Sequence, residues 1–294
     1  MIGNDFYFGE HWLSEFDMKV YDPDNQQEFV GRDIDRADIT SLRPVPNHYS
    51  TKYSDVLKLD FLIVKDPDIY ESNELKMDGD DISYVRAWLE SPKKPTHLIC
   101  PLESDDSATN YYGIFTDVKP YTVGNECYGL YLTFTCNSPY GFSDMHERTY
   151  IVGSGVSTTG TFMNVSAEYN EYLKPIVTII SGSTFGSNDG ITIQNQSDDN
   201  KEMTLVLPEG LSSVVIDCQK KIITDGEGNI LTMADIGLTL PISDGYNFVS
   251  SEMYLFYWLR LVPNFNKLVF TTPEYSTVIK VKIDAQYIVK SGGF

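Results

Sequence analysis

Along most of the chain, apolar and polar residues alternate over short stretches that turn-forming residues separate, and this pattern predicts half-buried β-strands. The clearest alternation runs through residues 127–136, where every second side chain falls on one face: Tyr128, Leu130, Leu132, Phe134 and Cys136. Pro139 ends this strand, because proline has no amide hydrogen to donate to a β-ladder. Residues 53–64 are predicted to form another strand, with one apolar face: Leu57, Leu59, Phe61 and Ile63.

One segment of the first half departs from this alternation and predicts a helix. Asp78, Asp80 and Asp81 can accept hydrogen bonds from the unpaired amides of a helix N-terminus, and their charge suits its positive dipole end. Apolar side chains then recur at helical spacing: Ile82, Val85, Trp88 and Leu89. Pro92 ends the predicted helix. We therefore expect one amphipathic helix of about three turns, followed by strands over residues 98–102 and 111–118.

The second half of the chain predicts strands alone, with turn signals between them. The predicted strands are residues 175–180, 191–195, 203–207, 214–218, 268–271 and 279–289. Short strands at such regular spacing favour a β-sandwich. Residues 143–161 are rich in glycine, serine and threonine, and we expect them to form a linker or a mobile arm. The predicted fold is mainly β with one short helix, in two domains that cover residues 1–142 and 143–294.

Length and composition fit this division and exclude some classes of partner. A chain of 294 residues can bury two cores, and its 20 tyrosines and 15 phenylalanines favour strands over helices. A net charge of −20 argues against binding nucleic acid or an anionic membrane through charge. No secretory signal and no apolar run of ~20 residues are evident, so we expect a soluble protein made in a cytoplasm. Its four cysteines are expected to be buried free thiols.

Short motifs in both halves resemble one family, the distal tail proteins (Dit) of bacteriophages with long non-contractile tails. In the first half, the motifs that carry the resemblance are Arg43-Pro44, Trp88-Leu89 and Ser138-Pro139-Tyr140, in that order. In the second half, they are Pro175 and residues 191–195, 215–218 and 259–266. The chain departs from the family at Pro263-Asn264, where the family more often has Pro-Gly, and this leaves the type of turn open.

The resemblance implies a fold and a role. Residues 1–142 would form a belt or split-barrel β-domain that closes into a hexameric ring, or a back-to-back dodecamer, and residues 143–294 a galectin-like β-sandwich outside it. The protein would be a structural hub in the tail tip or baseplate of a phage or prophage virion, synthesised in the cytoplasm of the bacterial host. Its expected partners are further copies of itself, the tail tube protein, the tail-tip protein and receptor-binding proteins. The resemblance implies no enzyme activity, no cofactor and no metal.

Candidate chemical sites are sparse, and each has a simpler explanation. The histidines are far apart in sequence and form no metal or catalytic motif: His11, His48, His97 and His146. Residues 153–160 resemble a phosphate-binding loop but lack its Gly-Lys-Ser/Thr ending, so a flexible arm is favoured. Residues 78–81 lack the ligand spacing of a calcium loop and are predicted to cap the helix. The acidic residues of segment 103–106 are predicted to be a solvated loop rather than a glycosidase pair.

Trp258 is the residue that we single out for a contact with a glycan or a partner. It lies in the aromatic segment 254–259, and galectin-like domains stack sugars on an exposed tryptophan; a place in the sandwich core or a subunit contact is the favoured alternative. Two other functions stay open. A carbohydrate-binding module or adhesin, secreted or on the virion, predicts an exposed Trp258, and a cryptic glycosidase or esterase predicts a carboxylate pair or a serine in a cleft.

Overall fold

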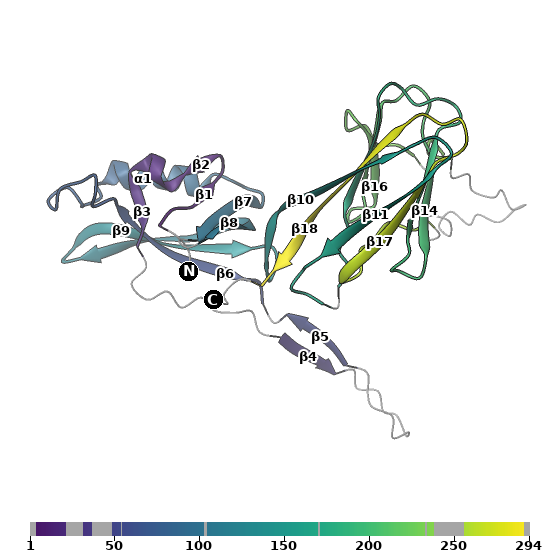
Figure 1. Ribbon diagram of the computed structural model, residues 1–294. Helices are drawn as coiled ribbons and strands as arrows, with labels where there is room; N and C mark the ends of the chain where they lie inside the picture. Colours follow the sequence, from purple (N-terminus) through teal and green to yellow (C-terminus); the bar gives the residue numbers. More distant parts are fainter. Residues whose placement is uncertain are drawn as a thin grey trace, which may run out of the picture. The chain divides into compact units, whose positions relative to one another are not determined.

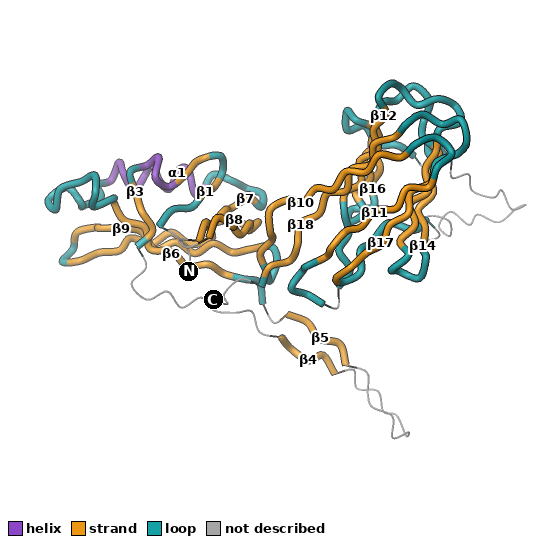
Figure 2. Tube along the Cα trace, viewed as in Figure 1, coloured by secondary structure: helices purple, strands orange, loops and turns teal. Residues whose placement is uncertain are grey.

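A computed structural model describes residues 4–21, 32–36, 49–53, 55–102, 105–169, 171–232, 234–237 and 256–290 (Figure 1). The chain divides into two compact units. The N-terminal unit comprises residues 1–144 together with 288–294, and the C-terminal unit comprises residues 145–287. Each unit has its own hydrophobic core, and strands dominate both (Figure 2). The prediction of a mainly β protein with one short α-helix is confirmed for the described residues.

The N-terminal unit is an antiparallel sheet with one α-helix. Its strands are β1 (Tyr7–Phe8), β2 (His11–Trp12), β3 (Met18–Val20), β6 (Lys58–Lys65), β7 (Thr96–Leu102), β8 (Asp105–Val123) and β9 (Glu126–Cys136). A long hairpin of β8 and β9 is central. On one side, β9 pairs with β6, which pairs with β3; on the other side, β8 pairs with β7, which pairs with β1. A short 3-10 helix, η1 (Leu13–Phe16), joins β2 to β3. Separately, β4 (Arg32–Arg36) and β5 (Tyr49–Tyr53) form a two-stranded antiparallel ribbon.

The α-helix of this unit, α1 (Gly79–Glu90), begins where the acidic cluster predicts. The Asp78 carboxylate accepts hydrogen bonds from the amides of Asp80 and Asp81, at 2.9 Å each, and Asp81 accepts one from the amide of Asp78 at 3.0 Å. This reciprocal capping box satisfies amides that have no partner within the helix. Val85 and Leu89 are buried against the sheet, so the predicted helix and its apolar face are confirmed.

The strand predicted from residues 127–136 is confirmed as β9, with alternate side chains buried: Leu130, Leu132, Phe134 and Cys136. The strand predicted over residues 53–64 is wrong at its start, because β6 begins at Lys58 and Tyr53 ends β5. Lys58 pairs with Thr135 near the end of β9. Since β9 ends at Cys136, before the Ser138-Pro139 turn, it does not extend far enough to pair with residues before Lys58 in a continued β6.

The C-terminal unit is a sandwich of two antiparallel sheets (Figure 1). One sheet contains, in order, β16 (Ile222–Asp225), β15 (Ser213–Asp217), β12 (Ile176–Ser181), β18 (Ile279–Val289) and β10 (Gly141–Val152). The other contains β11 (Ser157–Asn164), β17 (Asn264–Thr271), β13 (Gly190–Asn195) and β14 (Lys201–Val206). Alternate residues of both sheets form one core, and the strands predicted here are confirmed, with β17 and β14 each starting earlier than predicted.

The linker predicted over residues 143–161 is wrong, since this segment contains most of β10 and the start of β11. Its threonines are the reason, because threonine suits the outward face of a strand as well as a loop. Gly160 serves packing: it lies on the buried face of β11, and a Cβ atom there would overlap the Tyr150 ring. Glycine thus marks close contact at this position rather than flexibility.

All four cysteines are free; Cys100, Cys136 and Cys218 are buried, and Cys127 is half-buried. Burial raises the pKa of the Cys136 thiol to about 12, so it stays protonated at neutral pH. No helix in the described part of the chain is long and apolar enough to cross a membrane.

Candidate functional site

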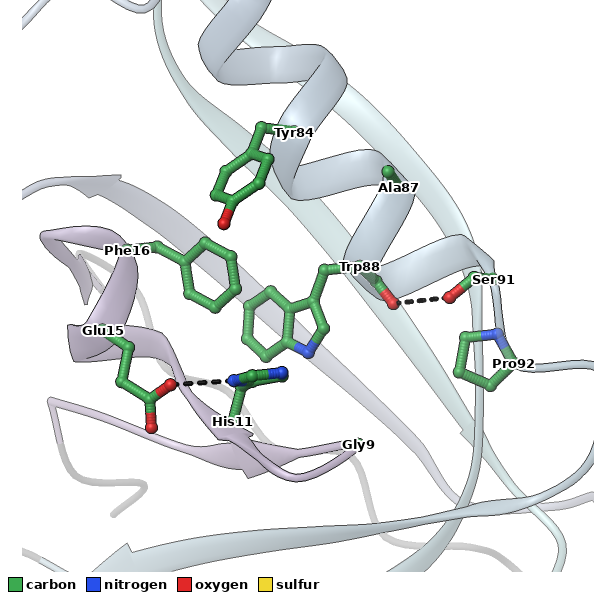
Figure 3. A pocket seen from close by; sticks show the side chains of 9 residues that line it. All are labelled: Gly9, His11, Glu15, Phe16, Tyr84, Ala87, Trp88, Ser91 and Pro92. Atoms are coloured by element: carbon green, nitrogen blue, oxygen red, sulfur yellow. Dashed lines mark hydrogen bonds and ion pairs between the residues drawn. The ribbon is translucent and has the colours of Figure 1, made fainter.

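A cavity of about 470 Å³ opens in the N-terminal unit between the β1–β2 turn, η1 and the C-terminal half of α1 (Figure 3). Its walls are mainly aromatic and small residues, with one acidic side chain. The lining residues from the first segment are Gly9, His11, Glu15 and Phe16. Those from α1 and the residues after it are Tyr84, Ala87, Trp88, Ser91 and Pro92. The cavity therefore joins two segments that lie about seventy residues apart in sequence.

The Trp88 ring is fixed at the centre of a stack of aromatic rings. The rings of Phe6 and Phe16 both lie nearly parallel to it, with centroid distances of 5.8 and 4.3 Å. The indole Nε1 of Trp88 donates a hydrogen bond to the carbonyl oxygen of Phe8 at 2.9 Å. Two rings of the protein itself thus stack with Trp88, and the rings of Tyr84 and His11 also lie by Phe16 (Figure 3).

Glu15 gives the cavity its negative charge. Its Oε2 lies 2.8 Å from Nδ1 of His11 (Figure 3). Its Oε1 accepts a hydrogen bond from the amide of Trp12 at 3.2 Å. These hydrogen bonds, that from His11 first, lower the pKa of the Glu15 carboxyl below its ordinary value. The group is therefore ionised at neutral pH, and about half of its side chain is exposed. No lysine or arginine is among the residues that line the cavity.

The geometry is that of a binding site. The hydroxyl of Ser91 is hydrogen-bonded to the carbonyl oxygen of Trp88 at 3.3 Å, so it is engaged by the helix end. His11 is oriented by Glu15, but the two are not joined by a hydrogen-bonded nucleophile among the residues that line the cavity. Aromatic walls with one fixed carboxylate can instead hold a ligand that has both a flat surface and a positive charge.

Trp258, the residue singled out from the sequence, lies in the C-terminal unit. It is half-buried, packs against the core there, and meets Phe256 edge-to-face with the centroids 4.8 Å apart. The possible glycan or partner contact of Trp258 stays a prediction.

A buried polar network lies two residues further along the chain from Trp258. Arg260 donates two hydrogen bonds to Asp198, at 2.7 and 3.0 Å, and the Tyr257 hydroxyl donates a third at 2.7 Å. Burial would raise the pKa of Asp198, but the hydrogen bonds from Arg260 and Tyr257 outweigh it and lower that pKa. The guanidinium also lies 3.8 Å above the Tyr172 ring. This network fixes the loop structure and leaves the Asp198 carboxylate enclosed.

The remaining candidates are not brought together. Among the described residues, no group of three or more histidine, cysteine, aspartate or glutamate side chains could hold a metal ion. His97 is bonded to Asn110, His146 packs on Tyr287, and His48 lies outside the described residues. The glycines of residues 153–160 lie in the β10–β11 turn and in β11. Glu103 also lies outside the described residues, and Asp105 and Asp106 begin β8.

The sequence analysis missed the cavity, although two local signals pointed to it. Tyr84 and Trp88 are four residues apart and are therefore neighbours on the surface of α1; His11 and Glu15 have the same spacing, although they lie in β2 and η1. That the two pairs meet depends on the stacking of Phe16 on Trp88, which is a tertiary contact. Periodicity within either segment could not predict it.

Comparisons with known proteins find a family model and solved structures that are similar to this chain. Residues 1–138 match the model of a family described as phage tail protein N-terminal domain. The chain is similar to the Dit protein of phage SPP1, described as a paradigm of the hub adsorption apparatus in phages infecting Gram-positive bacteria. The identity is 11%, the TM-score is 0.60, and the match covers 96% of this chain and 98% of that one. The structural likeness shows a shared fold.

Two structures of the phage P2 baseplate in its activated conformation are also similar. With Ca, the matched chain has 10% identity and a TM-score of 0.47, covering 97% of this chain and 98% of that one. With Sr, the values are 12% and 0.43, covering 95% and 97%. No curated protein matches the sequence.

Proposed function

We propose that this chain, which is a Dit-like phage tail protein, is a structural hub at the distal end of a long non-contractile tail. The observation that carries the proposal is the match of residues 1–138 to a phage tail protein N-terminal domain, within a chain that shares its fold with SPP1 Dit almost from end to end. A role in the tail or baseplate follows from the family match. The more specific assignment, to a ring at the tip of the tail, is our proposal.

In this proposal the two parts of the chain have different tasks. The N-terminal domain, residues 1–142, closes with five further copies into a ring that joins the tail tube protein to the tail-tip protein. The C-terminal domain, residues 143–294, is a galectin-like sandwich that lies outside the ring and docks receptor-binding proteins. Cyclic closure suits a hub, because a head-to-tail interface repeated around an axis leaves no interface unpaired.

The role is structural rather than enzymatic. The acidic groups with the clearest hydrogen bonds serve the fold: Asp78 caps α1, Asp198 binds Arg260, and Asp189 accepts hydrogen bonds from Thr277 and Gly186. Such uses place carboxylates in caps and loops instead of pairing them across a cleft. They support a protein that acts through its surfaces.

Mass and shape in solution test this proposal. Light scattering on the full chain is expected to give about 200 kDa for six copies of the 33.3 kDa chain, or about 400 kDa for two stacked rings. Negative-stain images of the same fraction should show six-fold rings with a central opening. If the chain alone is monomeric, it is mixed with the tail tube and tail-tip proteins of the same phage. A chain that stays monomeric and binds neither protein would contradict the hub.

A further inference from the structure

We propose that the cavity between η1 and α1 binds an arginine side chain presented by a basic segment of another protein. The inference concerns the chemistry of the cavity, so it does not depend on the ring or on the position of the chain in a tail. Three independent features of the site support it: the negative charge of the segments that form it, the aromatic side chain of Phe16, and the C-terminal end of α1.

The two segments that form the walls of the cavity are strongly acidic, although Glu15 is the one carboxylate in the lining itself. Residues 4–17 and 78–92, the segments that contain every lining residue, carry eight carboxylates and one arginine, and no lysine. The one arginine, Arg86, is already bonded to Glu90 through two contacts of 3.1 and 3.0 Å. Lys65 neutralises Asp81 at 2.7 Å, and the exposed Lys93 and Lys94 follow only after Pro92. A positive ligand would therefore be attracted to this surface and would meet no lysine or arginine among the lining residues.

The open aromatic surface suits a planar cation. Trp88 covers one face of Phe16, while Tyr84 lies beside it at 5.4 Å with its side chain largely exposed. A guanidinium that stacks on the outer face of Phe16 would gain a cation–π interaction and would lie within reach of the Glu15 carboxylate. The site suits a sugar less well, because the Trp88 indole is half-buried and already stacks with Phe6 and Phe16.

The end of α1 adds negative potential at the rim. The last four carbonyl groups of a helix have no amide partner within it, and together they carry a partial negative charge. The last turn of α1 contains no basic residue, and the hydroxyl of the cap residue Ser91 donates a hydrogen bond to the carbonyl oxygen of Trp88. Ala87 and Gly9, with small or absent side chains, leave room for a ligand to approach this end. The guanidinium has five donors, enough to reach both carbonyl and carboxylate oxygens.

The test uses the full chain labelled with 5-fluorotryptophan, whose three fluorine signals come from Trp12, Trp88 and Trp258. The probe is the peptide acetyl-Gly-Arg-Gly-amide, titrated at constant ionic strength against its citrulline analogue, which has the same shape without the charge. The arginine peptide is expected to shift the Trp88 signal to saturation and leave Trp258 unchanged. The citrulline peptide should bind about tenfold more weakly or worse, because the charge-assisted contacts are lost.

Two variants separate this site from a general effect of negative charge. Glu15→Gln keeps the acceptor oxygen for the Trp12 amide and should weaken the arginine peptide about fivefold to tenfold. Glu71→Gln makes the same change of charge at an exposed residue outside the cavity and should have no effect. Equal responses to arginine and citrulline, a response only to N-acetylglucosamine, or no shift of Trp88 with any probe would each overturn the proposal.

Discussion

The hydroxyl of Tyr287 donates a hydrogen bond to the backbone carbonyl oxygen of Met163, 2.6 Å away. Met163 belongs to β11, which ends the order of its sheet and, among the described strands, pairs with β17. Tyr150 makes the matching contact two residues earlier, with its hydroxyl 2.7 Å from the carbonyl oxygen of Thr161. An edge strand exposes unpaired backbone groups that can pair with another chain. These two tyrosines, from β18 and β10, cover carbonyl groups on that edge.

Removing the hydroxyl groups should therefore loosen the edge. Tyr150→Phe and Tyr287→Phe are each expected to lower the free energy of unfolding by about 1 kcal/mol, the usual net value of one such hydrogen bond. Denaturation with urea, followed by circular dichroism, gives the measurement. The double variant should also show faster exchange of the β11 amides. Tyr275→Phe, at a side chain that is 90% exposed, is the control and should leave stability unchanged. Equal stability of all three variants would show that the edge contacts contribute nothing.

A second prediction concerns Gly129, where β9 pairs with β6 and the two backbones are close. A Cβ atom at this position would overlap the carbonyl oxygen of Ile63, a backbone atom that cannot move without disturbing the ladder. Gly129→Ala is expected to lower the free energy of unfolding by more than about 2 kcal/mol, through overpacking of a paired strand. Gly79→Ala is the matched control, because nothing lies within 4 Å of the Cβ it would add. If Gly129→Ala leaves the free energy of unfolding unchanged, β6 and β9 can move apart to admit the Cβ atom without loss of stability, and the prediction is wrong.

The parts of the fold that local pattern determines were predictable from the sequence. Leu130, Leu132 and Phe134 alternate within one strand, and Asp78 caps a helix only three residues ahead of Asp81, so both signals are complete within a short segment. The segment around Gly160 was mispredicted because glycine and threonine content cannot distinguish a loop from a strand packed against Tyr150. The cavity required the stacking of Phe16 on Trp88, a contact between segments far apart in sequence that no local pattern encodes.

A third prediction concerns Trp258. If its ring serves packing, substitution should lower the stability of the protein; if it binds a glycan, substitution should instead lower glycan binding. Its ring packs against the core of the C-terminal unit and meets Phe256 edge-to-face. Trp258→Ala is expected to lower the free energy of unfolding by about 3 kcal/mol, and Trp258→Phe by clearly less, since most apolar contact is kept. Urea denaturation measures both. A Trp258→Ala variant that keeps full stability but loses binding on a glycan array would contradict packing and favour the carbohydrate-binding module.

The ion pair between Asp198 and Arg260 predicts how the stability of the C-terminal unit depends on pH. The pKa of Asp198 in the folded state is lowered from its ordinary value of 3.8, so the folded protein binds this proton more weakly than the unfolded chain does. The stabilisation is therefore fully present above about pH 4 and is lost as the pH falls through the lower, folded pKa. Asp198→Asn should cost about 2–4 kcal/mol at neutral pH, because it leaves the Arg260 guanidinium without its charged partner.

The measurement is the unfolding of the C-terminal unit in urea, followed by the signal of fluorinated Trp258 between about pH 3 and pH 7. The gap in stability between the natural chain and Asp198→Asn should narrow as the pH falls below about 4, because the Asp198 carboxyl of the unfolded chain then binds a proton and favours unfolding of the natural chain. Asp80→Asn, at an exposed position in α1, removes one charge without breaking a buried pair and should follow the natural chain throughout. If this gap in stability instead stays constant over the whole range, protonation of Asp198 does not change the stability of the unit. The charge of Asp198 is then not what stabilises the loop.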